Sequence, residues 1–133
     1  MNSLNRILEF LKESQTYYLG TIEDNKPKVR PFGTINLFED KLYIQTGKSK
    51  DVYKQLMNNP NFEICAFFNG EWLRLEGKLI DDNRIEAKKA MLDNYPELRS
   101  MYDENDDNTR VFYISEGKAS FYSFTKEKEE IIL

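Results

Sequence analysis

The stretch that decides the fold is FEICAFFNGEWLRLEGKLI, residues 62–80. At its centre, Asn69-Gly70 is the dipeptide most typical of a two-residue β-hairpin, because both residues accept the positive φ that such a turn requires. The residues on either side are rich in aliphatic and aromatic side chains, which favour extended structure. The stretch therefore predicts two antiparallel strands, residues 62–68 and 71–80.

The second predicted strand alternates between apolar and polar side chains. Leu73 and Leu75 are expected to face the core, whereas Trp72 leads the opposite face, which otherwise carries charged residues. A tryptophan in that place suggests contact with a ligand or with a partner subunit. In the first strand, Cys65 is expected to be buried and structural, because its neighbours are apolar.

Further strands are predicted on both sides of this hairpin. Residues 16–22, 28–38 and 41–46 are expected to form a three-stranded meander. Helices are predicted at 3–12, from Ser49 as cap to 58–60, and at 83–95, with a short turn from Pro96; strands follow at 111–115, 118–125 and 131–133. The sum is a mainly β (α+β) protein, an antiparallel barrel or sandwich with peripheral helices.

Composition limits the function classes. The 133 residues suit one domain, 1–133, and the net charge of −4 argues against nucleic acid or an anionic membrane as partner. The single cysteine excludes an internal disulfide and favours a reducing compartment. No apolar run approaches the roughly 18 residues of a membrane span, and the N-terminal apolar residues have helical spacing. We therefore expect a cytoplasmic protein.

Common catalytic and metal sites are not predicted. The chain has no histidine, which removes Ser-His and Cys-His triads and most zinc sites. In the acidic loop 103–108, Asp103, Asn105 and Asp107 alternate as in a calcium loop, but the glycine and the distal glutamate of that motif are absent. No metal site is expected, and no residue is identified as a general acid or base.

Two segments have the chemistry of an anion site. Gln45-Thr46-Gly47-Lys48-Ser49-Lys50 leads into a helix and offers hydroxyls, ammonium groups and free backbone N–H groups, although an ordinary polar loop would have the same composition. In Val29-Arg30-Pro31-Phe32-Gly33, Pro31 cannot donate to a ladder, so this strand should lie at an edge or a bulge. Arg30 alternates to the opposite face from Val29 and suits bidentate phosphate binding, although an irregular edge strand with an exposed arginine is the alternative.

These segments, in this order, resemble the pyridoxamine 5′-phosphate oxidase-like family of FMN-binding split β-barrels. The resemblance is carried by Arg30-Pro31-Phe32-Gly33, by Gln45-Thr46 with Ser49-Lys50, by Asn59-Pro60 and by the strand that begins at Trp72. It implies a homodimer that binds FMN and acts on a small-molecule redox substrate. The implied FMN-binding residues are Val29, Arg30, Pro31, Phe32, Gly33, Gln45, Thr46, Lys48, Ser49, Lys50 and, from the second subunit, Trp72.

The chain also departs from the vitamin-oxidising members of that family. Their C-terminal tryptophan and Arg-x-His-type motif are absent, and Trp72 replaces a glutamine. We therefore do not predict pyridoxamine phosphate oxidase activity, and family membership alone does not establish a reaction. An FMN-dependent oxidoreductase of unknown substrate is the leading hypothesis. The alternatives are a flavin carrier or sensor without turnover, a cofactor-free dimeric barrel, and a related cofactor such as a deazaflavin or haem.

Overall fold

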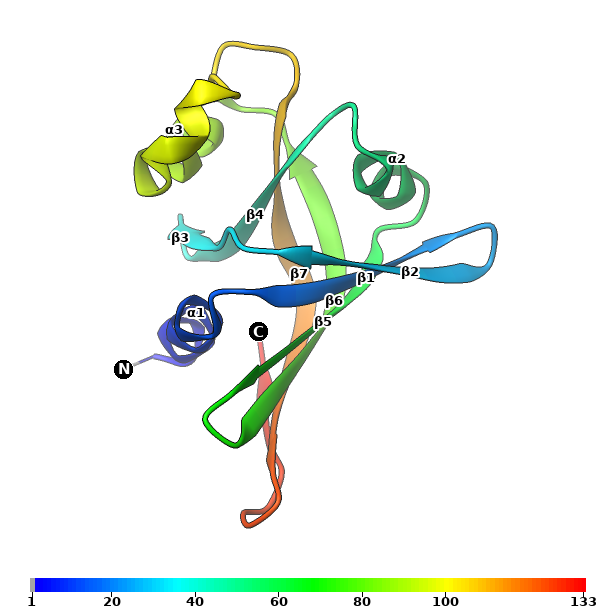
Figure 1. The fold of residues 1–133 in the computed structure, drawn as a ribbon, viewed down its shortest axis with the longest axis vertical. Helices are drawn as coiled ribbons and strands as arrows, with labels where there is room; N and C mark the ends of the chain where they lie inside the picture. Colours follow the sequence, from blue (N-terminus) through cyan, green and yellow to red (C-terminus); the bar gives the residue numbers. More distant parts are fainter. Residues whose placement is uncertain (1) are drawn as a thin grey trace.

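The computed structural model describes residues 2–133, and Met1, the first residue of the predicted domain, lies outside them. Strands dominate, and helices lie at the periphery (Figure 1). In chain order the elements are α1 (Ser3–Ser14), β1 (Tyr17–Glu23), β2 (Lys26–Phe32), β3 (Asn36–Phe38), β4 (Lys41–Gly47), α2 (Asp51–Asn58), β5 (Asn61–Phe68), β6 (Glu71–Asp82), α3 (Ile85–Asn94), the 3-10 turn η1 (Pro96–Ser100), β7 (Thr109–Ser123) and β8 (Glu129–Ile132).

The strands form one eight-stranded antiparallel sheet in the order β2-β1-β5-β6-β7-β4-β3, with β8 added to β7. The long strand β7 pairs with β4 through residues 109–113 and with β8 through residues 118–121. The end strands β2 and β3 do not pair with each other in the described chain, so the curved sheet stays open on that side. The predicted class, a mainly β split barrel with peripheral helices, is confirmed.

The hairpin predicted at Asn69-Gly70 is confirmed. Both residues have positive φ, 52° and 80°, and the flanking residues Phe68 and Glu71 are paired across the turn. A Cβ added at Gly70 would meet nothing within 4 Å, so the requirement for glycine there is conformational.

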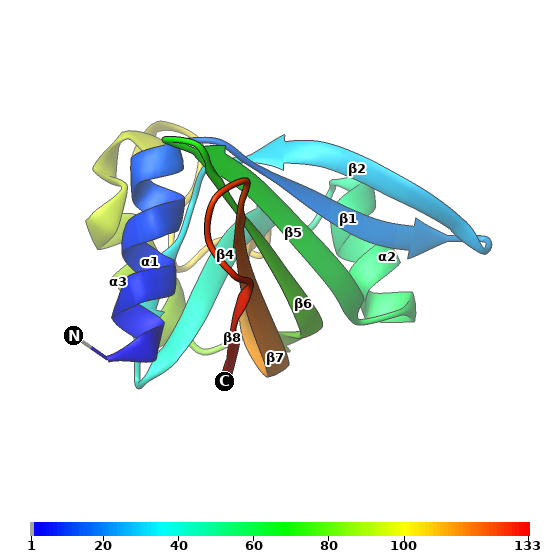
Figure 2. The same ribbon diagram turned by 90° about the horizontal axis from the view of Figure 1, so that it is seen from below.

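The core fills the concave side of the sheet. Leu73 and Leu75 are fully buried, as predicted, and α1 packs Ile7 and Leu11 against the same cluster. Asn2 caps α1 by accepting a 2.8 Å hydrogen bond from the N–H of Asn5. Seen from below, α1 and α3 lie at one end of the sheet, whereas α2 lies under the β1–β2 hairpin at the other (Figure 2).

The predicted three-stranded meander is wrong. Strand β2 pairs with β1, but β4 pairs with β3 and β7. Residues 33–35 leave the sheet, because Gly33 follows a proline-containing edge strand and the backbone of Ile35 bonds to the Tyr95 hydroxyl at 3.0 Å in both directions. The predicted segment 28–38 is therefore two strands, and β2 and β4 face each other across the open side of the sheet.

Other boundaries also differ from the prediction. Residues 109–123 form the single strand β7, because a register shift opposite Gly77 absorbs the irregularity at Glu116, which has positive φ. The first residue of helix α2 is preceded by Lys50 as cap, with no side-chain hydrogen bond, so Ser49 is not the cap. None of the helices among residues 2–133 is both long and apolar enough to cross a membrane.

Cys65 is exposed, which contradicts the prediction that it is buried. In β5 the inward positions are Phe62, Ile64 and Ala66, so Cys65 points to the outer face. The outer side of this strand carries Cys65 and Phe67 together with Glu63, so an apolar residue in β5 is not necessarily a core residue.

Candidate functional site

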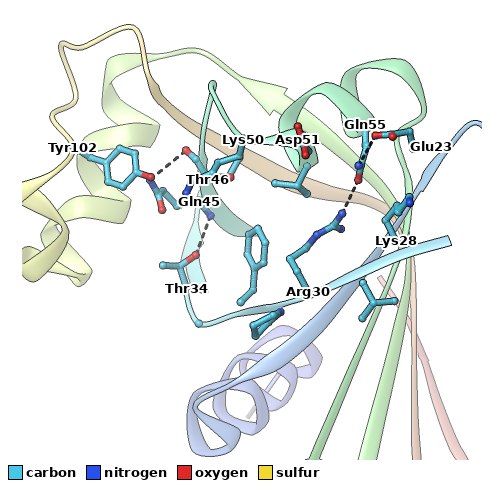
Figure 3. A pocket seen from close by; sticks show the side chains of 15 residues that line it. Glu23, Lys28, Arg30, Thr34, Gln45, Thr46, Lys50, Asp51, Gln55 and Tyr102 are labelled. Carbon is cyan, nitrogen blue, oxygen red and sulfur yellow. Dashed lines mark hydrogen bonds between the residues drawn. The ribbon is translucent and has the colours of Figure 1, made fainter. Parts of the chain in front are cut away.

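A cavity of about 570 Å³ opens between the edge strand β2, the end of β4 and the start of α2 (Figure 3). Its volume lies within the range typical of small-molecule sites. Its lining consists of Glu23, Lys28, Val29, Arg30, Pro31, Phe32, Gly33, Thr34, Gln45, Thr46, Lys50, Asp51, Val52, Gln55 and Tyr102.

Arg30 is half-buried, and the structure fixes its guanidinium group at one end of the cavity. Its Nη1 donates to the carbonyl of Leu19 at 3.2 Å and to the hydroxyl of Thr21 at 2.7 Å, and its Nη2 donates to Oε1 of Gln55 at 2.6 Å. A guanidinium carries more N–H donors than these contacts use, so donors remain for a ligand. Arg30 therefore presents an ordered cation to the cavity.

Gln55 is the buried centre of this network and was missed in the sequence. It is 5% exposed, and its Oε1 also accepts a 2.5 Å hydrogen bond from Thr21. Its Nε2 donates to Oε1 of Glu23 at 2.8 Å. The available signal was a polar residue within the apolar stripe of α2, because Gln55 lies next to Leu56 and three residues after Val52.

The charges that line the cavity are mixed. Lys28, Arg30 and Lys50 supply positive charge, and Glu23 and Asp51 supply negative charge. Burial lowers the pKa of Arg30, and the carboxylates of Asp51 and Glu23 act in the opposite direction. Lys28 and Arg30 come from β2 and Lys50 is the cap of α2, so the lining offers positive groups from two elements to an anionic group of a ligand.

The other end of the cavity is polar without formal charge. The side chain of Thr34 accepts a 3.0 Å hydrogen bond from the N–H of Gln45, and Nε2 of Gln45 donates to the carbonyl of Thr46 at 3.2 Å. The hydroxyl of Tyr17 holds the carbonyl of Thr34 at 2.5 Å. Tyr102 closes this end, and Figure 3 shows its ring directed toward Gln45 and Thr46. Neither Thr34 nor Tyr102 was predicted, because their approach depends on the tertiary fold.

Most of the residues predicted from the sequence line this one cavity. They are Val29, Arg30, Pro31, Phe32, Gly33, Gln45, Thr46 and Lys50. The two segments with the chemistry of an anion site, 29–33 and 45–50, thus meet across the open side of the sheet, although they are not neighbours in a meander.

Lys48 and Ser49 are not part of the cavity lining. Their backbone N–H groups donate to Asn108, to its carbonyl at 2.7 Å and to its Oδ1 at 3.1 Å, and Lys48 Nζ pairs with Asp107 at 3.0 Å. Gly47 allows this packing, because a Cβ there would lie 3.1 Å from the Tyr102 hydroxyl. The acidic loop therefore occupies N–H groups that the sequence suggested for a phosphate, and a role for Lys48 and Ser49 stays a prediction.

Trp72 lies on the outer face of the sheet, away from the cavity of its own chain. Its ring stacks on Tyr122, with centroids 5.5 Å apart and planes at 7°, and Phe124 is 5.2 Å away. The same face exposes Tyr18 and Phe67, at 51% and 63%. This outer face extends through Val29, which is 66% exposed and also lines the cavity.

An open antiparallel barrel with a cavity of mixed charge along its edge strand defines a split β-barrel. The sequence profile of the family described as Pyridoxamine 5′-phosphate oxidase matches residues 4–115. The chain belongs to the pyridoxamine 5′-phosphate oxidase-like family of FMN-binding split barrels. Among curated proteins no match is found.

Solved structures agree with this assignment. A NimC/NimA family protein from Clostridium acetobutylicum is 39% identical, with a TM-score of 0.93 over 97% of this chain and 91% of that one. General Stress Protein 26 from Bacillus anthracis is 18% identical, with a TM-score of 0.73 over 98% and 100%. A pyridoxamine 5′-phosphate oxidase-related, FMN-binding protein from Nostoc punctiforme is 16% identical, with a TM-score of 0.69 over 98% and 94%. The last two similarities concern the fold alone.

Proposed function

We propose that this protein binds FMN in the cavity between β2, β4 and α2, as a homodimer, and uses it as a redox cofactor for a small-molecule substrate. The observation that carries the proposal is the ordered guanidinium of Arg30 at one end of the cavity. Family membership supports FMN as the ligand, and so does the FMN-binding relative from Nostoc punctiforme.

The residues present fit a phosphorylated flavin. Arg30 and Lys50 would hold the phosphate, and Thr46 would add a hydroxyl donor. The uncharged end, with Thr34, Gln45 and Tyr102, suits the polar and uncharged parts of such a ligand. We keep Lys48 and Ser49 as secondary candidates for the phosphate, since they would first have to leave Asp107 and Asn108.

Strand β2 would form one wall of the flavin site. It pairs with β1 along one edge, and residues 28–33 line the cavity along the other. Backbone N–H and C=O groups on that edge can bond to the heteroatoms of a ring system without any special side chain. Val29 and Phe32 would add apolar contact with the ring.

The homodimer would complete the site. The outer face that carries Trp72, Tyr18 and Phe67 exposes aromatic side chains beside charged residues such as Arg74 and Glu63, as expected of a surface that a second subunit covers. Because Val29 belongs both to this face and to the cavity rim, a second copy docked here would bring its own residues to the cavity. We assign Trp72 of that second copy to the wall of the flavin site.

When bound, FMN supplies hydride or electron transfer, which no side chain of the chain can provide. The chain's own residues would bind the phosphate, hold the ring against β2 and exclude water at the dimer interface. With its single cysteine on the surface, the protein suits a reducing compartment, and we propose the cytoplasm.

Purification followed by a visible absorption spectrum and mass spectrometry of any released small molecule tests this proposal. We expect the absorption bands of a flavin and the mass of FMN. Anaerobic reduction by a nicotinamide, followed by reoxidation with an added acceptor, would separate an oxidoreductase from a flavin carrier. A colourless protein that takes up no FMN on titration would contradict the proposal.

A further inference from the structure

We propose that Gln55 is a positioning residue that holds Arg30 toward the cavity through a neutral acceptor instead of a carboxylate, and that it thereby makes the site selective for the phosphorylated form of its ligand. This inference rests on the proposed function for its choice of FMN as a probe. The geometry on which it stands is independent of any flavin.

Gln55 is a buried residue of α2, and its side chain joins this helix to Arg30. Its Oε1 accepts from Nη2 of Arg30 at 2.6 Å and from the hydroxyl of Thr21 at 2.5 Å, and Thr21 accepts from Nη1 at 2.7 Å. Nη1 and Nη2 of Arg30 are therefore both held by buried acceptors, the hydroxyl of Thr21 and Oε1 of Gln55. An arginine whose guanidinium is already held by hydrogen bonds loses less side-chain entropy on binding an anion than a freely moving arginine does.

The chemical identity of the acceptor matters as much as its position. A carboxamide oxygen accepts the hydrogen bond but carries no charge, so Gln55 holds Arg30 without neutralising it. The carboxylates of Asp51 and Glu23 act on Arg30 from nearby, but its hydrogen bonds in the described residues go to Leu19, Thr21 and Gln55. A carboxylate in the same place would form an ion pair with Arg30 and cancel that charge. The acidic residue of this network, Glu23, is held one step further away, on Nε2 of Gln55 at 2.8 Å.

Glu23 fixes the orientation of the carboxamide. Because a carboxylate accepts and cannot donate, it must face the NH₂ group of Gln55, which turns Oε1 toward Arg30 and Thr21. In this row of three side chains, the neutral oxygen of Gln55 contacts Arg30, and the negative charge of Glu23 contacts the NH₂ group of Gln55 instead. Figure 3 shows these side chains in line at the right-hand end of the cavity.

Variants at residue 55 distinguish two effects, the loss of the hydrogen bond that positions Arg30 and the addition of a negative charge beside it. Gln55→Glu keeps an acceptor but adds a charge, whereas Gln55→Met keeps the unbranched shape and removes the hydrogen bonds to Arg30, Thr21 and Glu23. Lys54→Ala is the matched control, because Lys54 is exposed on the same helix and lies outside the cavity lining. Circular dichroism and thermal unfolding establish that each variant is folded before any binding measurement.

The first readout is calorimetric affinity for FMN and for riboflavin, which lacks the phosphate. We expect Gln55→Glu and Gln55→Met to weaken FMN binding roughly ten- to hundredfold, with riboflavin binding unchanged, because only the charge-assisted phosphate contact is lost. A purely structural role of Gln55 would weaken both ligands equally. Lys54→Ala should leave both affinities within about threefold of those of the unmodified protein.

The second readout does not depend on flavin. In ¹⁵N-labelled protein the Nε–Hε signal of Arg30, assigned with Arg30→Lys, should shift saturably on titration with inorganic phosphate, and Gln55→Glu should abolish the shift. If the unmodified protein shows this shift but binds no FMN, the proposed function fails and the role of Gln55 stands. If phosphate does not shift the Arg30 signal, or if both Gln55 variants keep the phosphate response and the preference for FMN, the inference is overturned.

Discussion

Nη2 of Arg30 lies 2.6 Å from Oε1 of Gln55, and this contact joins the edge strand β2 to the buried side of helix α2. Strand β2 is paired to the rest of the sheet through β1 alone among the described residues. The contact with α2 therefore fixes the cationic group of an edge strand, which would otherwise be among the more mobile parts of the fold. The same bond that orders the strand also orders the candidate site.

Removing the cations should weaken FMN binding. We expect Arg30→Ala and Lys50→Ala each to lower the binding free energy by roughly 1–3 kcal/mol, because each removes a charge-assisted contact with the phosphate. Calorimetric titration with FMN measures this loss. Lys54→Ala is the control, since Lys54 is exposed on the same helix and outside the cavity lining. Unchanged affinity in the Arg30→Ala, Lys50→Ala double variant would rule out the assigned clamp.

Trp72→Ala should weaken FMN and riboflavin alike. Trp72 is assigned to the ring rather than to the phosphate, and the loss of an aromatic contact is expected to lower both binding free energies by about 0.5–1.5 kcal/mol. Titrations with both ligands measure the effect, and Ile85→Ala, at an exposed apolar residue of α3, is the control.

Mixed dimers test whether Trp72 acts across the interface. If Arg30 and Trp72 of one site come from different subunits, mixing Arg30→Ala protein with Trp72→Ala protein places both defects in one site and leaves the other site intact. We expect high-affinity FMN binding to return in the heterodimers. Failure of the mixture to regain any high-affinity site would place Trp72 outside a shared site.

Phe67→Glu should dissociate the dimer. Phe67 is 63% exposed on the outer face of β5, opposite Trp72 of β6 in the sheet, and a buried unpaired carboxylate there would be costly. Light scattering should give twice 15.8 kDa for the unmodified protein and about 15.8 kDa for the variant. Ile85→Glu places the same charge on α3 and should not change the mass. A monomeric unmodified protein that still binds FMN would contradict the shared site.

Asp82 should make stability depend on pH in the acidic range. Its buried carboxylate accepts from Nη2 of Arg84 at 2.9 Å and from the hydroxyl of Tyr43 at 2.8 Å, and the hydrogen bond with Arg84 is the main cause of its lowered pKa. Because the folded pKa lies below the unfolded value of about 4, this stabilisation is present above pH 4 and is lost as the pH falls through the folded pKa.

Asp82→Asn is therefore expected to destabilise the protein by about 1–3 kcal/mol at neutral pH and to make its stability less sensitive to acid. Urea unfolding at about pH 7 and about pH 3 measures both effects. Asp24→Asn, in the exposed turn between β1 and β2, is the control. An equal loss of stability on acidification in Asp82→Asn and in the unmodified protein would contradict this role.

The local parts of the fold were predictable because local chemistry determines them. Asn69-Gly70 specifies its turn through backbone conformation, and Pro31 marks β2 as an edge strand. Strand pairing was less predictable: a meander of β1, β2 and β4 satisfies the same local pattern, and the competing partner of β4 is β7, more than sixty residues away in the chain. Cys65 was misplaced because a strand rich in apolar residues is interpreted as buried on both faces, whereas Cys65 and Phe67 lie on the exposed outer face of β5.

The candidate site also has residues that could be predicted from the sequence and residues that could not. Arg30, Thr46 and Lys50 were predictable from residue type and spacing, because phosphate chemistry requires cations and hydroxyl donors. Gln55 and Tyr102 were not, because a neutral side chain on a helix or in a loop gains its role only through the residues that the fold brings to it. The occupation of the Lys48 and Ser49 amides by Asn108 was likewise invisible in the sequence.

The central claim is that Arg30 and its neighbours bind the phosphate of a flavin. Calorimetric titration of the unmodified protein with FMN and with riboflavin tests this claim most directly, because the two ligands differ only in the phosphate. We predict that FMN binds at least about tenfold more tightly, as expected for a charge-assisted contact. Equal affinity for the two ligands, or no binding of either, would contradict the account.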